Sequence, residues 1–200
     1  AERQITVGQA TYPLPKLFMV MATQNPIEQE GTYPLPEAQL DRFLLHVQVD
    51  YPEAEHEKSI LHLARAEARS ESTKIASKFE PIEQKVLFEA RDQVLDLYMA
   101  ESLEEYLLQI ILATRNPGAY GQDLATWLQY GASPRASIAL DRCARAKAWL
   151  AQRSFVTPED IQDVVYDVLR HRLILSYEAE AEGVTIEHFI NELICRIAVP

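Results

Sequence analysis

Asn25, Arg42 and Arg135 stand where side chains of their type can contact a polar or charged ligand. Asn25 follows the apolar run FMVMA at 18–22, which predicts a strand buried on both faces. The apolar run stops at TQNP (23–26), where Pro26 disfavours helical geometry at Asn25. Because α/β proteins place ligand contacts at the ends of buried strands, this position favours a ligand-facing amide. The alternative is that Asn25 only caps a turn.

Arg42 lies near the end of a short charged segment, EAQLDRF at 37–43, that leads into a predicted strand over 44–50. A guanidinium suits a phosphate because its planar fork donates two parallel hydrogen bonds and does not deprotonate. The alternative is an ion pair within the chain, with Asp41, Glu37 or another acid.

Arg135 falls in the first turn of a predicted helix that Ser133 caps and Pro134 opens. The helix dipole disfavours a cation there by about 0.3–1 kcal/mol. Where a cation is tolerated beside free backbone N–H groups, the cation and the N–H groups together form a binding site for an anion. In the alternative, Arg135 pairs with a carboxylate or lies in solvent. Arg142 and Arg145, on roughly the same face, are predicted to form a solvated basic stripe.

The order and spacing of three segments are similar to those of the MoxR family of AAA+ ATPases. The segments are ATQNP at 22–26, EGTYPLPEAQLDRF at 30–43 and GASPRASIAL at 131–140. The resemblance implies that Asn25 is the sensor-1 residue, Arg42 the arginine finger and Arg135 the sensor-2 arginine. It also implies the carboxyl-terminal part of an α/β nucleotide-binding core over residues 1–51, followed by an all-α lid over 52–200. Such a chain is mainly α overall.

The resemblance implies ATP and Mg²⁺ as cofactors, although their main binding motifs are absent from the sequence. A phosphate loop has the form GxxxxGK[ST], and no lysine here follows a glycine. The paired carboxylates that hold Mg²⁺ are missing as well. We therefore expect both motifs upstream of Ala1, and little ATP binding or hydrolysis by these residues alone. Glu28, Glu30 and Glu37 are interpreted as loop charges rather than catalytic carboxylates.

As partners, the resemblance implies copies of the same protein in a hexameric ring, client proteins, and proteins with von Willebrand factor A domains. A cytoplasmic location is expected. Two alternatives stay open: a non-enzymatic helical interaction domain that uses the arginines for protein contacts, and a ring ATPase acting on DNA. The formal charge of −11 and pI near 4.9 argue against a nucleic-acid surface. No apolar run reaches membrane-spanning length.

Metal binding is not predicted, since the five histidines show no HxxxH or HExxH spacing. Cys143 and Cys195 stand alone in apolar settings, and we expect both to be reduced core residues.

The remaining pattern predicts a hairpin followed mostly by helices. Alternating residues at 4–7 and 10–12 flank Gly8-Gln9, a typical hairpin turn. Apolar residues then recur at helical spacing in six stretches. Two further stretches, 119–130 and 177–183, are predicted to be loops. The six expected helices cover 53–69, 81–97, 102–115, 133–152, 157–169 and 185–197.

Overall fold

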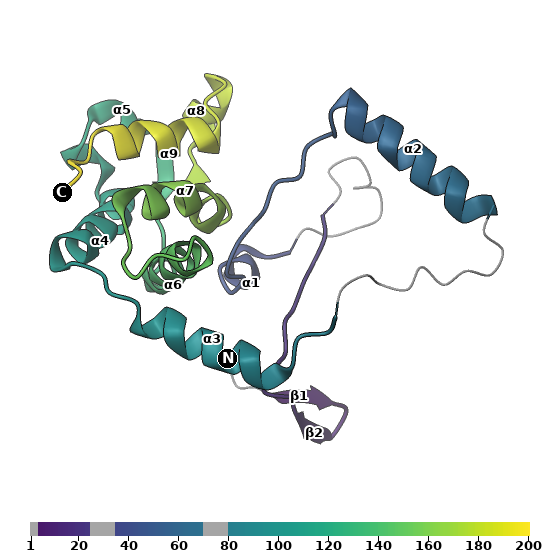
Figure 1. The fold of residues 1–200 in the computed structure, drawn as a ribbon. Helices are drawn as coiled ribbons and strands as arrows, with labels where there is room; N and C mark the ends of the chain where they lie inside the picture. The colour runs from purple at the N-terminus through teal and green to yellow at the C-terminus, as the bar shows by residue number, and fades with distance from the viewer. Residues whose placement is uncertain (1–3, 25–34, 70–79) are drawn as a thin grey trace.

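The computed structural model describes residues 4–24, 35–69 and 80–200, and their fold is mainly helical, as predicted (Figure 1). Among the described residues a hairpin comes first, three helices follow, and a compact helical bundle comes last. The elements in order are β1 (Gln4–Val7), β2 (Ala10–Pro13), α1 (Glu37–Leu40), α2 (Ala54–Arg69), α3 (Gln84–Asp96), α4 (Glu101–Arg115), η1 (Pro117–Ala119), α5 (Gln122–Trp127), β3 (Leu128–Tyr130), α6 (Pro134–Leu150), α7 (Pro158–Leu169), β4 (Ile174–Leu175), α8 (Tyr177–Ala181) and α9 (Ile186–Cys195).

The predicted hairpin is confirmed. β1 and β2 pair antiparallel, with Val7 opposite Ala10 and Gln4 opposite Pro13. Gly8 has φ +62° in the turn between them, a backbone conformation that glycine adopts without steric cost.

Two other predicted strands are wrong for the described residues. Residues 18–22 and 44–50 form no strand, and most of their apolar side chains are exposed. Met19 is 81% exposed and Val49 87% exposed, so neither stretch is the buried strand that its composition suggested. A strand needs a neighbouring strand to pair with and elements that cover its faces, and the described part of the chain places no strand beside either stretch.

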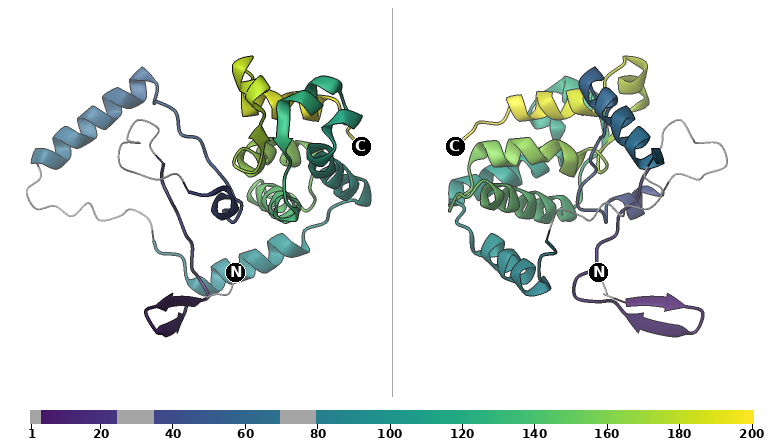
Figure 2. Two further views of the ribbon diagram at one scale, coloured as in Figure 1. Left: turned by 180° about the vertical axis from the view of Figure 1, so that it is seen from behind. Right: turned by 45° about the vertical axis from the view of Figure 1, so that its right-hand side comes forward.

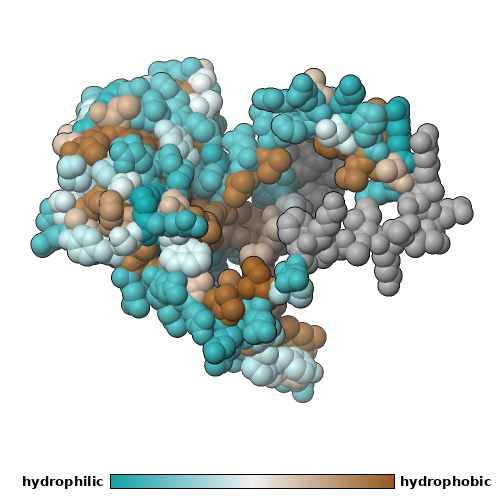
Figure 3. All heavy atoms as spheres, viewed as in Figure 1, coloured by the Kyte–Doolittle hydropathy of each residue, from teal (hydrophilic) through white to brown (hydrophobic). Residues whose placement is uncertain are grey.

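α2 and α3 form close to the ranges predicted from the helical spacing of their apolar residues, but their apolar faces are largely exposed. α2 stands apart from the bundle in Figure 1 and in the left view of Figure 2, and its Leu63 is 55% exposed. α3 begins three residues later than predicted and packs on α6, yet Val86 stays 51% exposed. Part of this apolar surface is visible in Figure 3.

The helices from α4 to α9 build the one hydrophobic core found among the described residues. α6 packs against α7, α4 and α3, while α9 packs against α4, α5 and α7. The buried apolar side chains of the described ranges all lie between Leu97 and Ile197. The predicted domain division at 51/52 stays a prediction. The largest fully buried side chains belong to Tyr106, Phe189, Ile110, Ile111, Leu124, Leu140 and Ile161.

Local caps explain why the bundle helices start where they do. Ser133 caps α6 with Pro134 at its first position, and Thr157 with Asp160 forms a capping box at α7. Thr185 caps α9 by accepting a hydrogen bond from the backbone N–H of His188. These three starts agree with the sequence prediction.

Both predicted loops of the bundle contain regular structure instead. Residues 119–130 include α5 and β3, and 177–183 include the short helix α8, which Ser176 caps. β3 pairs antiparallel with β4, a strand that the sequence pattern did not predict. The Ser176 hydroxyl also donates to the carbonyl of Thr126, which ties α8 to α5.

Two smaller predictions are wrong. Arg145 belongs to no solvated stripe: its side chain is only 14% exposed and binds Asp141, Glu104 and the carbonyl of Leu97. Cys143 is buried as expected, but Cys195 is exposed. No described helix has the length and apolar character needed to cross a bilayer.

Candidate functional site

The loop that carries Arg135 is fixed against the end of α4. A Cβ on Gly131 would lie 2.2 Å from the backbone oxygen of Thr114, so the close approach requires glycine. The Ala132 N–H donates to Thr114 Oγ1 at 3.0 Å, and the Ala132 carbonyl accepts from Arg115 Nε at 2.8 Å. These contacts hold the first turn of α6 in place.

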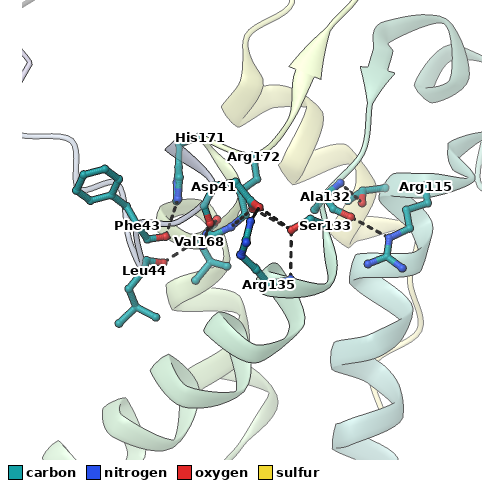
Figure 4. Close-up of polar contacts among 11 residues, drawn as sticks. Asp41, Phe43, Leu44, Arg115, Ala132, Ser133, Arg135, Val168, His171 and Arg172 are labelled. Carbon is teal, nitrogen blue, oxygen red and sulfur yellow. Dashed lines mark hydrogen bonds and ion pairs between the residues drawn. The ribbon is translucent and has the colours of Figure 1, made fainter. Parts of the chain in front are cut away.

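A carboxylate occupies the amino end of α6 (Figure 4). Ser133 Oγ accepts a hydrogen bond from the Arg135 N–H at 3.2 Å and donates to the two Asp41 oxygens, each 2.9 Å away. Negative charge is favoured at this end of the helix dipole. In this structure the group at the start of α6 is the chain's own Asp41, and the ligand site expected there stays a prediction.

Arg135 is part of the same cluster. Its Nη1 donates to Asp41 Oδ2 at 2.9 Å, while the Arg135 side chain stays 55% exposed. The contact matches the alternative interpretation, in which Arg135 pairs with a carboxylate.

The pKa of Asp41 lies below its ordinary value of 3.8. Burial alone would raise this pKa, but the hydrogen bonds from Arg135 and Ser133 and the charge of Arg172 outweigh burial. Asp41 is therefore a stable carboxylate at neutral pH, held between two guanidinium groups.

Arg172 is the second cation on Asp41, and sequence reasoning missed its role. Its side chain is 2% exposed, and its Nε lies 3.1 Å from Asp41 Oδ1. In the sequence, Arg170, His171 and Arg172 directly follow α7, where the negative end of the helix dipole alone would favour basic residues. That cluster was the available signal, but the partner of Arg172 lies 131 residues away in sequence.

The end of α7 and the residues after it bind the backbone that follows Asp41. The His46 N–H donates to the Asp167 carbonyl at 2.8 Å, and Arg170 Nη1 donates to the His46 carbonyl at 2.6 Å. His171 Nε2 lies 3.2 Å from the Phe43 carbonyl and must carry the proton to bind it. We call residues 41–46 the docked segment, because the bundle holds both of its ends.

His171 is kept neutral in this arrangement. Burial, followed by the charge of Arg172, lowers the pKa of His171 from 6.5 to about 4. Its Nδ1 is buried and has no hydrogen-bond partner among the described residues. Protonation would thus place a second cation beside Arg172 without an acceptor.

Arg42 projects from the docked segment into solvent. Its side chain is exposed, and no hydrogen bond or ion pair joins it to any residue that the structure describes. Its neighbour Asp41 is engaged by Arg135 and Arg172 instead. Of the predicted site residues, Arg135 binds Asp41, and Arg42 adjoins Asp41 only in sequence. Asn25 lies outside the described residues, as do Glu28 and Glu30.

Two family models match separate parts of the chain. The model of the ATPase family associated with various cellular activities (AAA) matches residues 1–45, and the AAA lid domain matches residues 123–193. The second range covers most of the helical bundle, including Arg135 and Arg172.

Curated relatives match the whole chain. This chain is 39% identical over 200 residues to the chaperone MoxR1 of Mycobacterium tuberculosis and 38% identical over 201 residues to the uncharacterised protein YeaC of Bacillus subtilis. It is also 32% identical over 213 residues to the protein MoxR of Paracoccus denitrificans. The chain spans 51%, 58% and 61% of the lengths of these three relatives.

A solved structure has the same arrangement. It is a putative ATPase from Cytophaga hutchinsonii, with a TM-score of 0.89 and 40% sequence identity. The match covers all of this chain and 59% of that one.

Proposed function

Since the chain belongs to the MoxR family of AAA+ ATPases, we propose that it is the carboxyl-terminal part of an ATP-driven chaperone-like machine that remodels or matures other proteins. In this proposal Arg42 is an arginine finger that acts on ATP bound to the neighbouring subunit. Arg135 acts on ATP bound to its own subunit, and Asn25 is the sensor-1 residue. The motifs that hold the phosphates and Mg²⁺ would stand upstream of Ala1.

The observation that carries the proposal is the placement of Arg42. An exposed guanidinium on a segment held at both ends is preorganised to reach a group outside its own subunit. A finger of this kind stabilises the charge that builds on the transferred phosphoryl group, and contributes about 10³–10⁵ to turnover.

The ion pair of Arg135 is compatible with its proposed role. The side chain is 55% exposed, and such pairs contribute about 0.2–1 kcal/mol. A phosphate near the start of α6 would meet the same helix dipole and a bidentate donor, so it competes well with Asp41 for Arg135.

Assembly and partners follow from the trans role of Arg42. A finger that serves a neighbour requires an oligomer, and we propose a hexameric ring with protein clients and von Willebrand factor A domain partners. An acidic chain of net charge −11 fits such protein partners better than DNA.

Mixed assemblies of the full-length protein test the two arginines. Arg42→Ala should leave ATP binding nearly intact while lowering turnover, because a finger acts mainly in the transition state. Mixing Arg42→Ala subunits with subunits that lack a working phosphate loop should partly restore hydrolysis, since some interfaces then combine one intact half from each. Arg135→Ala should weaken its own subunit's site, and the same mixing should restore nothing.

Two results would overturn the proposal. If the Arg42→Ala mixture shows no recovery while rings assemble, Arg42 is not a trans finger. If the full-length protein does not bind ATP, the chain is better explained as a helical interaction domain.

A further inference from the structure

We propose that Arg172 is the positioning residue of Arg42: it folds the backbone around the finger into one shape and fixes that shape to the lid. The inference rests on the proposed function, in which Arg42 acts across the subunit boundary. Arg172 itself would touch neither ATP nor client.

The contacts of Arg172 surround the position of Arg42 in the chain (Figure 4). Its Nη2 donates to the carbonyl of Asp41 at 3.3 Å and to the carbonyl of Phe43 at 2.5 Å. These are the residues immediately before and after Arg42. One nitrogen thus fixes the backbone on both sides of the finger, and the Arg42 side chain is left to point outward.

All five N–H groups of Arg172 are used. Besides the two contacts of Nη2, its Nε donates to Asp41 Oδ1, and its Nη1 donates to the carbonyls of Leu44 (3.4 Å) and Val168. Five donors therefore meet five acceptors, and four of the acceptors belong to residues 41–44. A lysine would keep the charge, but its three donors on one nitrogen cannot span these positions.

The burial of Arg172 makes the connection rigid. Its side chain is 2% exposed, and the same guanidinium binds Val168 at the end of α7. Leaving this site would strand a buried charge, so the backbone of 41–44 is expected to move with α7 rather than independently. The position of the lid therefore determines where Arg42 points.

Arg145 provides a matched control. It too is a largely buried arginine of the bundle, 14% exposed, with an ion pair to Asp141 and a hydrogen bond to the Leu97 carbonyl. None of these partners lies in the docked segment. Loss of Arg145 should therefore affect stability without affecting the finger.

The test uses Arg172→Lys in the full-length protein, with Arg145→Lys as control. Arg172→Lys should lower kcat by about ten- to a hundredfold, as a displacement of about 1 Å does, and leave KM for ATP nearly unchanged. Arg145→Lys should leave kcat within about twofold. Mixing Arg172→Lys subunits with phosphate-loop mutants should restore activity, because the defect lies in a finger that the other subunits supply intact.

A double variant gives the sharper readout. If Arg172 acts only through Arg42, then Arg172→Lys combined with Arg42→Ala should turn over at the rate of Arg42→Ala alone. A further fall of tenfold or more in the double variant, or no recovery on mixing, would overturn the inference. Either result would leave the proposed function intact, provided that Arg42→Ala alone lowers turnover and recovers on mixing. If Arg42→Ala has no effect, the proposed function itself fails.

A milder variant decides the question if Arg172→Lys does not fold. Asp41→Asn keeps the backbone carbonyls that Arg172 binds and removes the charge that its Nε meets. It should lower kcat severalfold and recover on mixing with phosphate-loop mutants. Unchanged turnover would overturn the inference.

Discussion

Removing the charge of Asp41 should release the docked segment from the bundle. Asp41→Asn keeps the size of the side chain but places an amide N–H₂ where a second carboxylate oxygen now accepts hydrogen bonds. The exposed pair with Arg135 contributes about 0.2–1 kcal/mol, and a hydrogen bond between charged groups such as Asp41 and Arg172 about 1.5–3 kcal/mol. Because one amide oxygen can still accept, we expect a loss of about 2–3 kcal/mol.

Amide exchange at His46 measures this loss, since its N–H donates to the Asp167 carbonyl only while the segment is docked. A loss of 2–3 kcal/mol corresponds to exchange about 30 to 150 times faster. Urea unfolding of the same variant should show a similar fall in the free energy of unfolding. Asp163→Asn is the control, because Asp163 pairs with Lys147 on the exposed surface of the same bundle. This variant should change the exchange rate at His46 by no more than about twofold and leave the free energy of unfolding nearly unchanged.

One result would refute the reasoning directly. If exchange at His46 in Asp41→Asn stays within twofold of the original rate, the charges on Asp41 do not hold the segment. If the bundle loses stability while His46 keeps its protection, Asp41 stabilises the bundle by another route.

Three further outcomes are expected. The pKa of His171 is near 4 in the folded state, whereas His171 of the unfolded chain takes up a proton near pH 6.5. The free energy of unfolding should therefore fall by up to about 3 kcal/mol as the pH drops from 6.5 to 4. In urea titrations at several pH values, His171→Gln should make this fall smaller. Asp160→Ala should cost about 2–4 kcal/mol of unfolding free energy, because it removes the α7 capping box and the partner of Arg153, whereas Glu159→Ala should cost less than about 1 kcal/mol. Calorimetric titration of the 200-residue chain should show no micromolar binding of Mg-ATP; such binding would reveal a phosphate site outside the expected motifs.

The helices were predictable because their signals are local. Ser133 with Pro134, and Thr157 with Asp160, set the starts of α6 and α7 within one turn of sequence. α8 was missed because its acidic residues suggested a solvated loop, although Ser176 caps it in the same way.

The strands predicted over 18–22 and 44–50 are wrong because their local signal is not sufficient. An apolar run indicates that a segment tends to be buried, but strand formation also requires a partner with free backbone groups. No signal within the run identifies that partner.

The centre of the site depends on distance along the chain. Asp41 and Arg172 are separated by 131 residues, and no local pattern links them. Sequence reasoning found Arg42 and Arg135 by family resemblance and by the position of Arg135 in its helix. It could not identify Asp41 as the partner of Arg135 and Arg172, because an acid beside an arginine is common and nothing near Asp41 indicates which distant residues bind it.

The long separation between Asp41 and Arg172 has a consequence during synthesis. A ribosome adds about 5–20 residues per second, so Arg172 is added about 7 to 26 s after Asp41. During that interval the backbone around Arg42 has no guanidinium on which to fold. On the proposed role of Arg42, a half-made subunit could not present its finger to a neighbour, and no active site would be completed before that subunit's own lid is finished.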